Sequence, residues 1–152
     1  MEGAREFTLS ILKGLIESSR EEYSMYMAAC KKVNDSKLKQ ILKNYITQKE
    51  EYIKKLESEI KRLGGNQPNT ALESNLNSDS LKYFAEDCDD NILNECVEKN
   101  KSTLNKYSTA INEDILWEVV PLIAKQYFDS KNMHNNLVYI YGKMHPTTIN
   151  VV

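Results

Sequence analysis

Two histidines and a limited set of carboxylates are the side chains of this sequence that could do metal chemistry. Dinuclear iron and manganese sites in four-helix bundles need a glutamate from each of two helices and a Glu-x-x-His pair from each of the other two. The chain has only His134 and His145, and the residues three positions before them are Lys131 and Gly142. Neither histidine completes such a pair. The sequence therefore predicts no complete dinuclear site, no catalytic residue and no bound cofactor.

Acidic side chains still gather on two of the helical segments. Glu17 and Glu21 lie one helical turn apart, and Glu95 and Glu98 form a similar pair later in the chain. Like charges at this spacing repel each other, and a metal ion or a basic side chain of a neighbouring helix would relieve the repulsion. Lys99 is a ready partner for Glu95. We expect these carboxylates to be solvated or salt-bridged.

A set of mostly neutral polar residues falls near the centre of each helical segment, on or beside its apolar stripe. We call this set the mid-bundle polar layer; it consists of Ser19, Glu22, Gln48, Asn100 and Gln126. It is either the remnant of a ligand site or small-molecule pocket, or a hydrogen-bonded layer that fixes helix register. The pattern favours the second interpretation, with Glu22 as the only charge near the layer.

Cysteines and tyrosines offer less specific chemistry. The chain has three cysteines, an odd number, and no Cys-x-x-Cys motif; they are Cys30, Cys88 and Cys96. We therefore expect reduced thiols. The alternative is a redox pair between Cys88 and Cys96. The nine tyrosines could form an electron relay beside a metal. Without a ligand set, they are better explained as amphipathic core residues whose hydroxyls reach the bundle edges.

Four segments with apolar residues at steps of three and four must position these groups; they cover about residues 8–33, 36–63, 90–111 and 115–141. Gly64 and Gly65 predict the end of the second helix, and Pro121 predicts a kink in the fourth unless its regular part starts near Trp117. A polar crossover over 66–78 and a short extra helix near 79–85 separate two long hairpins. We predict an all-α antiparallel four-helix bundle over residues 1–144, with a flexible tail at 145–152.

Composition excludes several classes of protein. A chain of 152 residues is one ordinary domain, and 20 basic against 22 acidic residues argue against a nucleic-acid binder. No apolar run approaches the roughly 20 residues of a membrane-spanning helix. The first residues, MEGAREFT, are not followed by the apolar stretch of a signal peptide. We therefore expect a cytoplasmic protein with no membrane and no nucleic-acid partner.

Several stretches together resemble a known family: LKGLIESSREEYSMY, NDSKLKQILKNYITQKEEYIKKLESEIKRLGG, ILNECVEKNKSTLNKYSTAI and EVVPLIAKQYFDSKNMHNNL. They are similar to bacterial four-helix-bundle proteins of the ferritin-like superfamily that form a domain of unknown function. The likeness covers about residues 9–144, and its best marks are Asp35 with Leu38, Gln48, RLGG, Glu95-Cys96, Tyr107, and Gln126 with His134. The resemblance implies a ferritin-like bundle with no established reaction. Members are often acidic at the position of Asn100, and this chain departs from them there.

Together these observations predict a non-enzymatic protein of unknown physiological role that acts through protein association, linked to stress or sporulation at most. One helix cannot direct Trp117, Phe128, Tyr139 and Tyr141 into one core, so we expect a homodimer through the fourth helix. Any other protein partner stays unidentified. One alternative is a small-molecule or lipid carrier that opens at Pro121. The other is a degenerate metal-binding ferritin-like protein, for iron or manganese storage or oxidation, using Glu17, Glu21, Glu22, Glu95, Asp129 or His134.

Overall fold

The computed structural model describes residues 2–66 and 88–144, and most of them are helical. Four α-helices and one 3₁₀ turn follow one another in these ranges: α1 (Glu2–Lys32), α2 (Ser36–Arg62), α4 (Asp89–Ile111), η1 (Trp117–Val119) and α5 (Val120–Met144). The described ranges contain no strand. The prediction of an all-α bundle is confirmed.

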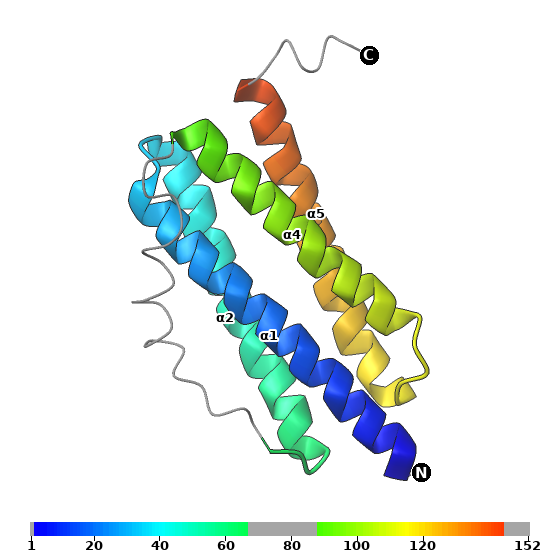
Figure 1. The fold of residues 1–152 in the computed structure, drawn as a ribbon. Helices are drawn as coiled ribbons and strands as arrows, with labels where there is room; N and C mark the ends of the chain where they lie inside the picture. The colour runs from blue at the N-terminus through cyan, green and yellow to red at the C-terminus, as the bar shows by residue number, and fades with distance from the viewer. Residues whose placement is uncertain (1, 67–87, 145–152) are drawn as a thin grey trace.

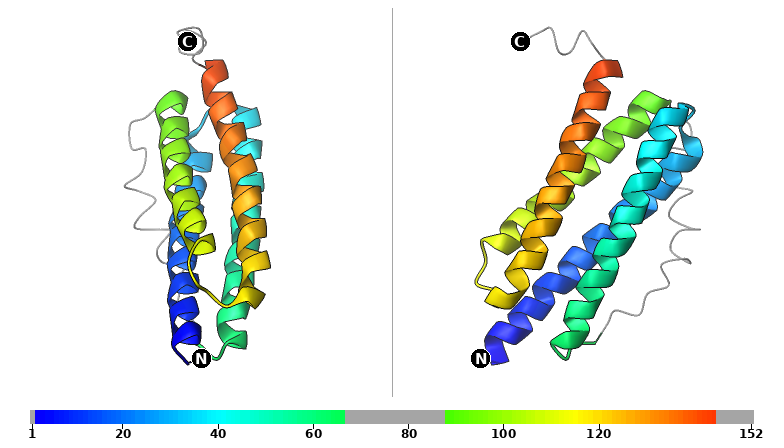
Figure 2. Two further views of the ribbon diagram at one scale, coloured as in Figure 1. Left: turned by 90° about the vertical axis from the view of Figure 1, so that its right-hand side faces the viewer. Right: turned by 180° about the vertical axis from the view of Figure 1, so that it is seen from behind.

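The helices form two antiparallel hairpins, α1 with α2 and α4 with α5 (Figure 1). Seen edge-on, α1 and α4 make one layer and α2 and α5 make the other (Figure 2). The end of α2 and the start of α4 lie at opposite ends of the bundle (Figure 1). Each helix therefore runs antiparallel to its neighbours, which opposes their macrodipoles favourably.

Asp35 sets the turn between α1 and α2. Its carboxylate accepts hydrogen bonds from the backbone N–H groups of Lys37 and Leu38, at 2.8 and 3.0 Å, and so caps the start of α2. From the other hairpin, the carboxylate of Asp89 accepts the N–H groups of Asn34 and Asp35. The first turn of α4 thus ties down the connection within the first hairpin.

The glycine pair ends α2 as predicted. Gly64 has φ of 79°, a conformation that favours glycine, and its N–H donates to the carbonyl of Lys61. The N–H of Gly65 donates to the carbonyl of Ile60 at 2.9 Å, which completes a Schellman motif. A Cβ at Gly65 would lie 2.7 Å from Leu9 Cδ2. Gly65 therefore also allows α1 to approach the end of α2.

Pro121 lies in the first turn of α5. The 3₁₀ turn Trp117–Val119 leads into the helix, which begins at Val120. A proline in the first turn removes an N–H that has no partner within the helix. The regular helix thus starts close to Trp117, as the sequence allowed, and Pro121 is not in its interior.

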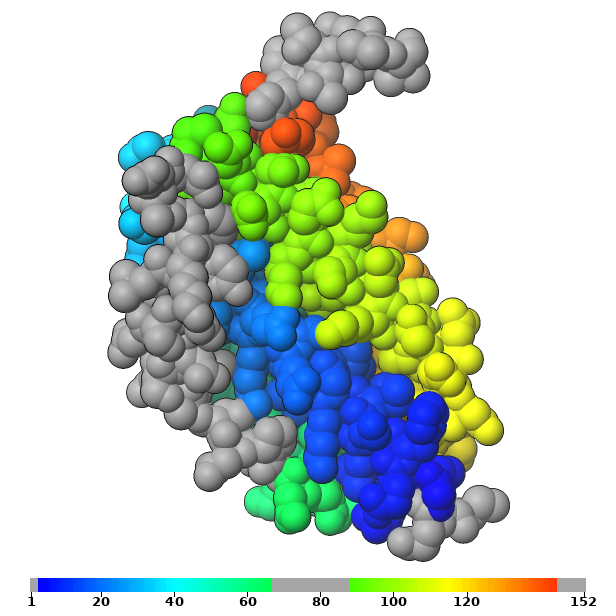
Figure 3. All heavy atoms as spheres, viewed as in Figure 1, coloured from blue at the N-terminus to red at the C-terminus, as the bar shows by residue number. Residues whose placement is uncertain are grey.

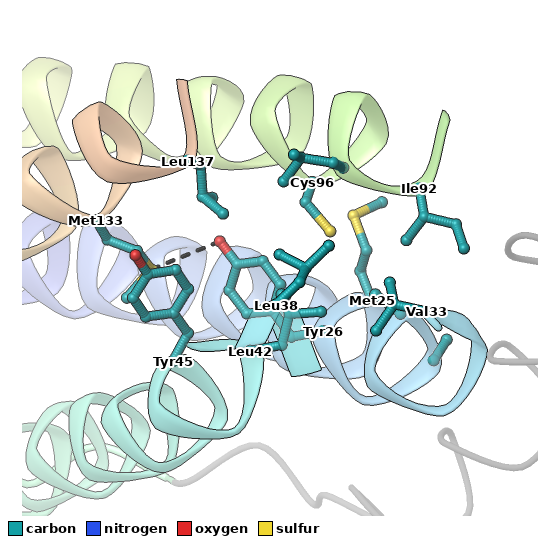
Figure 4. Close-up of a cluster of buried hydrophobic side chains, with 13 residues drawn as sticks. Met25, Tyr26, Val33, Leu38, Leu42, Tyr45, Ile92, Cys96, Met133 and Leu137 are labelled. Carbon is teal, nitrogen blue, oxygen red and sulfur yellow. Dashed lines mark hydrogen bonds between the residues drawn. The ribbon is translucent and has the colours of Figure 1, made fainter. Parts of the chain in front are cut away.

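Buried apolar side chains form two clusters, one towards each end of the bundle. The first apolar cluster is shown in Figure 4, where Tyr26 points towards Met133 and Tyr45. The second apolar cluster packs the other end, with Tyr107 as its largest member. Other members of the first are Met25, Ala29, Leu42, Ile92, Cys96 and Leu137, and of the second Leu12, Ile16, Leu56, Ile60, Val119 and Ile123. The polar layer lies between the two clusters.

Some predictions fall outside the described residues. These are most of the crossover, the short extra helix near 79–85 and the tail at 145–152. Among the helices that the structure does describe, none combines the length and apolar character needed to cross a membrane.

Candidate functional site: a buried ion pair at the bundle centre

A buried ion pair occupies the centre of the polar layer. Glu22 lies on α1 and Lys49 on α2, and the Nζ of Lys49 is 3.0 Å from Oε1 of Glu22. Both side chains are 0% exposed. Removing two charges from water is costly, and their mutual attraction offsets that cost only when further hydrogen bonds complete the site.

The second carboxylate oxygen of Glu22 receives those hydrogen bonds. Asn100 of α4 donates from Nδ2 to Oε2 at 2.7 Å. Tyr26, one turn further along α1, donates its hydroxyl to the same oxygen. The carboxylate is thus held by an ammonium from α2, an amide from α4 and a hydroxyl from its own helix.

Lys49 connects the pair to α5. Its ammonium donates to the hydroxyl of Ser130 at 3.3 Å and lies 5.2 Å from the ring centroid of Tyr52. A cation over a desolvated aromatic face gains about 2 kcal/mol. Glu22 and Lys49 therefore link all four helices through Asn100 and Ser130.

A second group of hydrogen bonds extends the layer towards the second apolar cluster. The hydroxyl of Tyr107 donates to Oε1 of Gln126 at 2.6 Å, and Ser19 Oγ lies 3.4 Å from the same hydroxyl. Gln126 donates from Nε2 to the carbonyl of Tyr52 at 3.3 Å. These contacts again join all four helices.

Two sulfur-containing residues border the layer on the other side. Met133 Sδ lies 3.6 Å from the Tyr26 hydroxyl (Figure 4). It also lies 3.9 Å from Asn100 Nδ2. Oδ1 of Asn100 is buried and has no hydrogen-bond partner within the described residues. Cys96 is fully buried nearby.

Burial raises the pKa of two tyrosine hydroxyls and one cysteine thiol around the ion pair. The pKa of Tyr26 is raised well above its ordinary value of 10.0 by burial and, next, by the charge of Glu22. Burial likewise raises the pKa of Tyr107 and of Cys96. These groups therefore stay protonated in the folded protein. Tyr26 consequently remains a hydrogen-bond donor to Glu22.

The structure brings four of the five residues proposed for the polar layer into it. Ser19, Glu22, Asn100 and Gln126 are buried there. Gln48 is only partly buried, and its Nε2 donates to the hydroxyl of Tyr52 at 2.6 Å.

Lys49 takes the layer position on α2. The prediction that Glu22 is the only charge near the layer is therefore wrong. The buried residues of α2 include Tyr45, Lys49, Tyr52 and Leu56, at alternating steps of four and three, and this spacing places position 49 inside. The helical spacing therefore indicates that position 49 is buried. The residue type argues against this, because lysine is usually exposed.

The acidic pairs of the sequence lie at the surface. Glu17, Glu21 and Glu95 are exposed. Lys99 of α4 forms its ion pair with Glu21 of α1 across the two helices, and not with Glu95 as expected. Asp129 pairs with Lys125 at 3.3 Å on α5.

The remaining candidate metal ligand, His134, lies on α5. It is half-buried, and its pKa is lowered by burial and then by the charge of Lys101. Within residues 2–66 and 88–144, no three His, Cys, Asp or Glu side chains form a group that could hold a metal ion.

The donor set at the bundle centre does not fit a dinuclear metal. An ammonium has no lone pair for a metal, and Lys49 stands 3.0 Å from the one buried carboxylate of the layer. The other groups that contact that carboxylate are the amide of Asn100 and the phenol of Tyr26. Two metal ions need several anionic or imidazole ligands, which this centre does not supply.

A surface groove lies between α1 and α4, the two helices of the layer seen in Figure 3. Its volume is about 350 Å³, and it is lined mainly by Ile11, Gly14 and Leu15 of α1 and by Lys106, Thr109 and Ala110 of α4. It is separate from the ion pair. No residue of the polar layer lines it.

Comparisons with known proteins agree with this architecture. A family described as a domain of unknown function (DUF2383) matches residues 8–113, more than half of the chain. No curated protein matches.

A solved structure from Anabaena variabilis matches with a TM-score of 0.75 and 15% identity. It is a two-domain protein with DJ-1/ThiJ/PfpI-like and ferritin-like domains, and the match covers 97% of this chain and 38% of that one. At this identity the likeness shows the fold, a ferritin-like bundle. The chain belongs to the DUF2383 family, whose function is unknown.

Proposed function

We propose that this protein is a non-enzymatic, cytoplasmic bacterial bundle that acts through protein association. The observation that carries the proposal is the closed ion pair at the bundle centre. Glu22 and Lys49 are both fully buried, form an ion pair with each other and are hydrogen-bonded to neighbouring side chains, so the place where a four-helix bundle can hold reactive metals is filled by the protein's own groups.

The ion pair also stabilises the alignment of the four helices. Each helix contributes one polar contact to it, and a charge left without its partner in the interior would be strongly destabilising. Register between the helices is therefore fixed by Glu22 and Lys49. A polar layer of this kind specifies which helices pair and in which alignment.

Exposed aromatic side chains on α5 and on the 3₁₀ turn that precedes it support the association part of the proposal. Trp117, Phe128 and Tyr139 are 82%, 62% and 62% exposed. Exposed apolar surface is a common feature of interaction sites, and aromatic side chains contribute much of the binding energy of interfaces. In the Anabaena protein, a ferritin-like domain is joined to a DJ-1-like domain. That arrangement supports a ferritin-like bundle that works beside another protein unit.

In-cell cross-linking of two variants in the source bacterium tests the proposal. Phe128→Glu changes only the outer face of α5, whereas Glu22→Leu combined with Lys49→Met replaces the interior ion pair. We expect the surface variant to lose the cross-linked products of the wild-type protein. The interior double variant should keep them.

The opposite result would contradict the proposal. If the Phe128→Glu variant kept every cross-linked product and the interior variant lost a measurable metal-dependent activity, the protein would act through its centre. Circular dichroism of both purified variants provides the folding control.

A further inference from the structure

A nucleophile and an electrophile are bound to the same buried carboxylate at the centre of the bundle. The ammonium of Lys49 lies 3.0 Å from Oε1 of Glu22, and the amide of Asn100 donates to Oε2 at 2.7 Å. All three side chains are 0% exposed. Lys49 lies on α2 and Asn100 on α4, two helices at diagonal corners of the bundle (Figure 2). An amine and a carboxamide from distant parts of the chain are thus held together away from water.

We propose that Lys49 and Asn100 slowly form an intramolecular isopeptide bond in the folded protein, with Glu22 as the general base and acid. The ion pair described above is the state that precedes the reaction. The product is an amide between Nζ of Lys49 and Cγ of Asn100, and the leaving group is ammonia. The reaction uses only groups that the bundle centre already contains. It does not depend on protein association.

The first step makes the lysine nucleophilic. The ammonium of Lys49 passes a proton to Oε1 of Glu22, which leaves a neutral amine beside a neutral carboxylic acid. This transfer avoids the cost of keeping two charges in the interior. The amine lone pair then attacks Cγ of Asn100 and forms the new C–N bond, while the electron pair of the carbonyl double bond moves to Oδ1.

The second step releases ammonia. The carboxylic acid of Glu22 gives its proton to Nδ2 of Asn100, with which it is already in contact. The C–N bond to Nδ2 breaks as the carbonyl double bond forms again. The nitrogen of Lys49 returns its extra proton to Glu22, and the ammonia takes that proton and leaves as ammonium. Glu22 is therefore a carboxylate again at the end.

The surroundings of the three groups favour this reaction. Oδ1 of Asn100 has no hydrogen-bond partner within the described residues, so the amide can turn and accept the proton of Glu22 at its oxygen during the attack. The hydroxyl of Ser130 lies 3.3 Å from Nζ and keeps the head of Lys49 at the centre. Groups held together in this way react as if they were highly concentrated. Burial also protects the amide from competing hydrolysis.

Intact-mass spectrometry of the full chain tests the proposal. Wild-type protein is purified in the cold and then incubated for several days at the growth temperature of the source bacterium, either folded or in urea. We expect the folded sample to lose about 17 Da, the mass of one ammonia, and the urea sample to keep its mass. Proteolysis of the folded sample should then release a branched peptide that joins the segments around Lys49 and Asn100.

Two variants separate the roles of the residues. Asn100→Leu removes the electrophile and leaves the ion pair, so it should keep its full mass. Glu22→Gln retains a side chain of the same shape beside Asn100 but cannot take the proton of Lys49, so it should form no link either. A branched peptide in Glu22→Gln would contradict the role of Glu22.

Two results with the wild-type protein would overturn the proposal. An unchanged mass of the folded sample, without a branched peptide, would show that the amine does not reach Cγ of Asn100. A gain of about 1 Da at Asn100 would show that water hydrolyses the amide instead. Neither result bears on α5, where the in-cell comparison of Phe128→Glu tests the proposed function separately.

Discussion

Replacing Lys49 by methionine removes the ammonium and keeps most of the side-chain volume. Glu22 would remain in the interior with only the hydroxyl of Tyr26 and the amide of Asn100 as donors. The substitution also removes the hydrogen bond to Ser130. It therefore measures how much the ammonium of Lys49, with its ion pair and its hydrogen bond, contributes to the free energy of unfolding.

The structure sets the size of the effect. Two unit charges at 3.0 Å attract by about 5 kcal/mol at the effective dielectric constant of 20 that suits protein sites. Breaking a buried pair on one side typically costs about 3–5 kcal/mol, because the remaining charge stays in the interior. A loss of this size should lower the melting temperature of a chain of this length by roughly 10 °C.

Urea and thermal unfolding followed by circular dichroism measure the change. Lys55→Met is the matched control, since Lys55 is exposed on the same helix, and it should alter the free energy of unfolding by less than about 0.5 kcal/mol. Glu22→Leu combined with Lys49→Met removes both charges and should recover most of the loss or exceed the wild-type stability.

The double variant makes the test decisive. If Lys49→Met alone changed the unfolding free energy by less than about 0.5 kcal/mol, the ammonium would be hydrated. The claim that water is excluded from the centre of the bundle would then be wrong. If the double variant were no more stable than Lys49→Met, the two charges would not be coupled.

Three further results are expected. Gln126→Leu should cost about 1–3 kcal/mol, because the buried Tyr107 hydroxyl loses its acceptor, and adding Tyr107→Phe should recover part of the loss in the same unfolding assay. The raised pKa values of Tyr26 and Tyr107 give stability that is fully present below about pH 10 and is lost as pH rises towards the folded-state pKa values; absorbance at 295 nm should therefore show these tyrosines ionising together with unfolding. Gly65→Ala should lower the melting temperature, because its Cβ would overlap Leu9, and an unchanged value would show that the end of α2 is freer than the packing implies.

Local signals in the sequence were enough for the helices and for both ends of α2, whereas α1 begins at Glu2, before the expected start near residue 8, and α5 begins at Val120, after the expected start near residue 115. Asp35 caps α2 because its side chain bonds to N–H groups two and three residues away, and Gly64 and Gly65 end the helix through backbone contacts to Lys61 and Ile60. Each of these interactions spans a few residues, so the residue types alone indicate it.

The centre of the bundle depends on contacts between distant parts of the chain. Glu22 and Asn100 could be placed near the layer from periodicity, but the partner of Glu22 is Lys49, a residue type that is seldom buried. A lysine enters the core only when a carboxylate of another helix faces it. That coincidence appears only after α1 and α2 are aligned.

The same reason explains the surface ion pairs. Lys99 has Glu95 one turn before it on α4, yet it pairs with Glu21 of α1 because those two helices pack side by side. Local spacing identifies available partners. Packing between helices selects among them.

Metal binding tests the central claim most directly, namely that Glu22 and Lys49 close the centre of this ferritin-like bundle. The protein is purified without chelator, titrated anaerobically with ferrous iron, and then exposed to air while ferric absorbance is followed. The account predicts less than one bound iron per chain and an oxidation rate equal to that of buffer. Two iron ions per chain, with faster oxidation that Glu22→Ala abolishes, would contradict it.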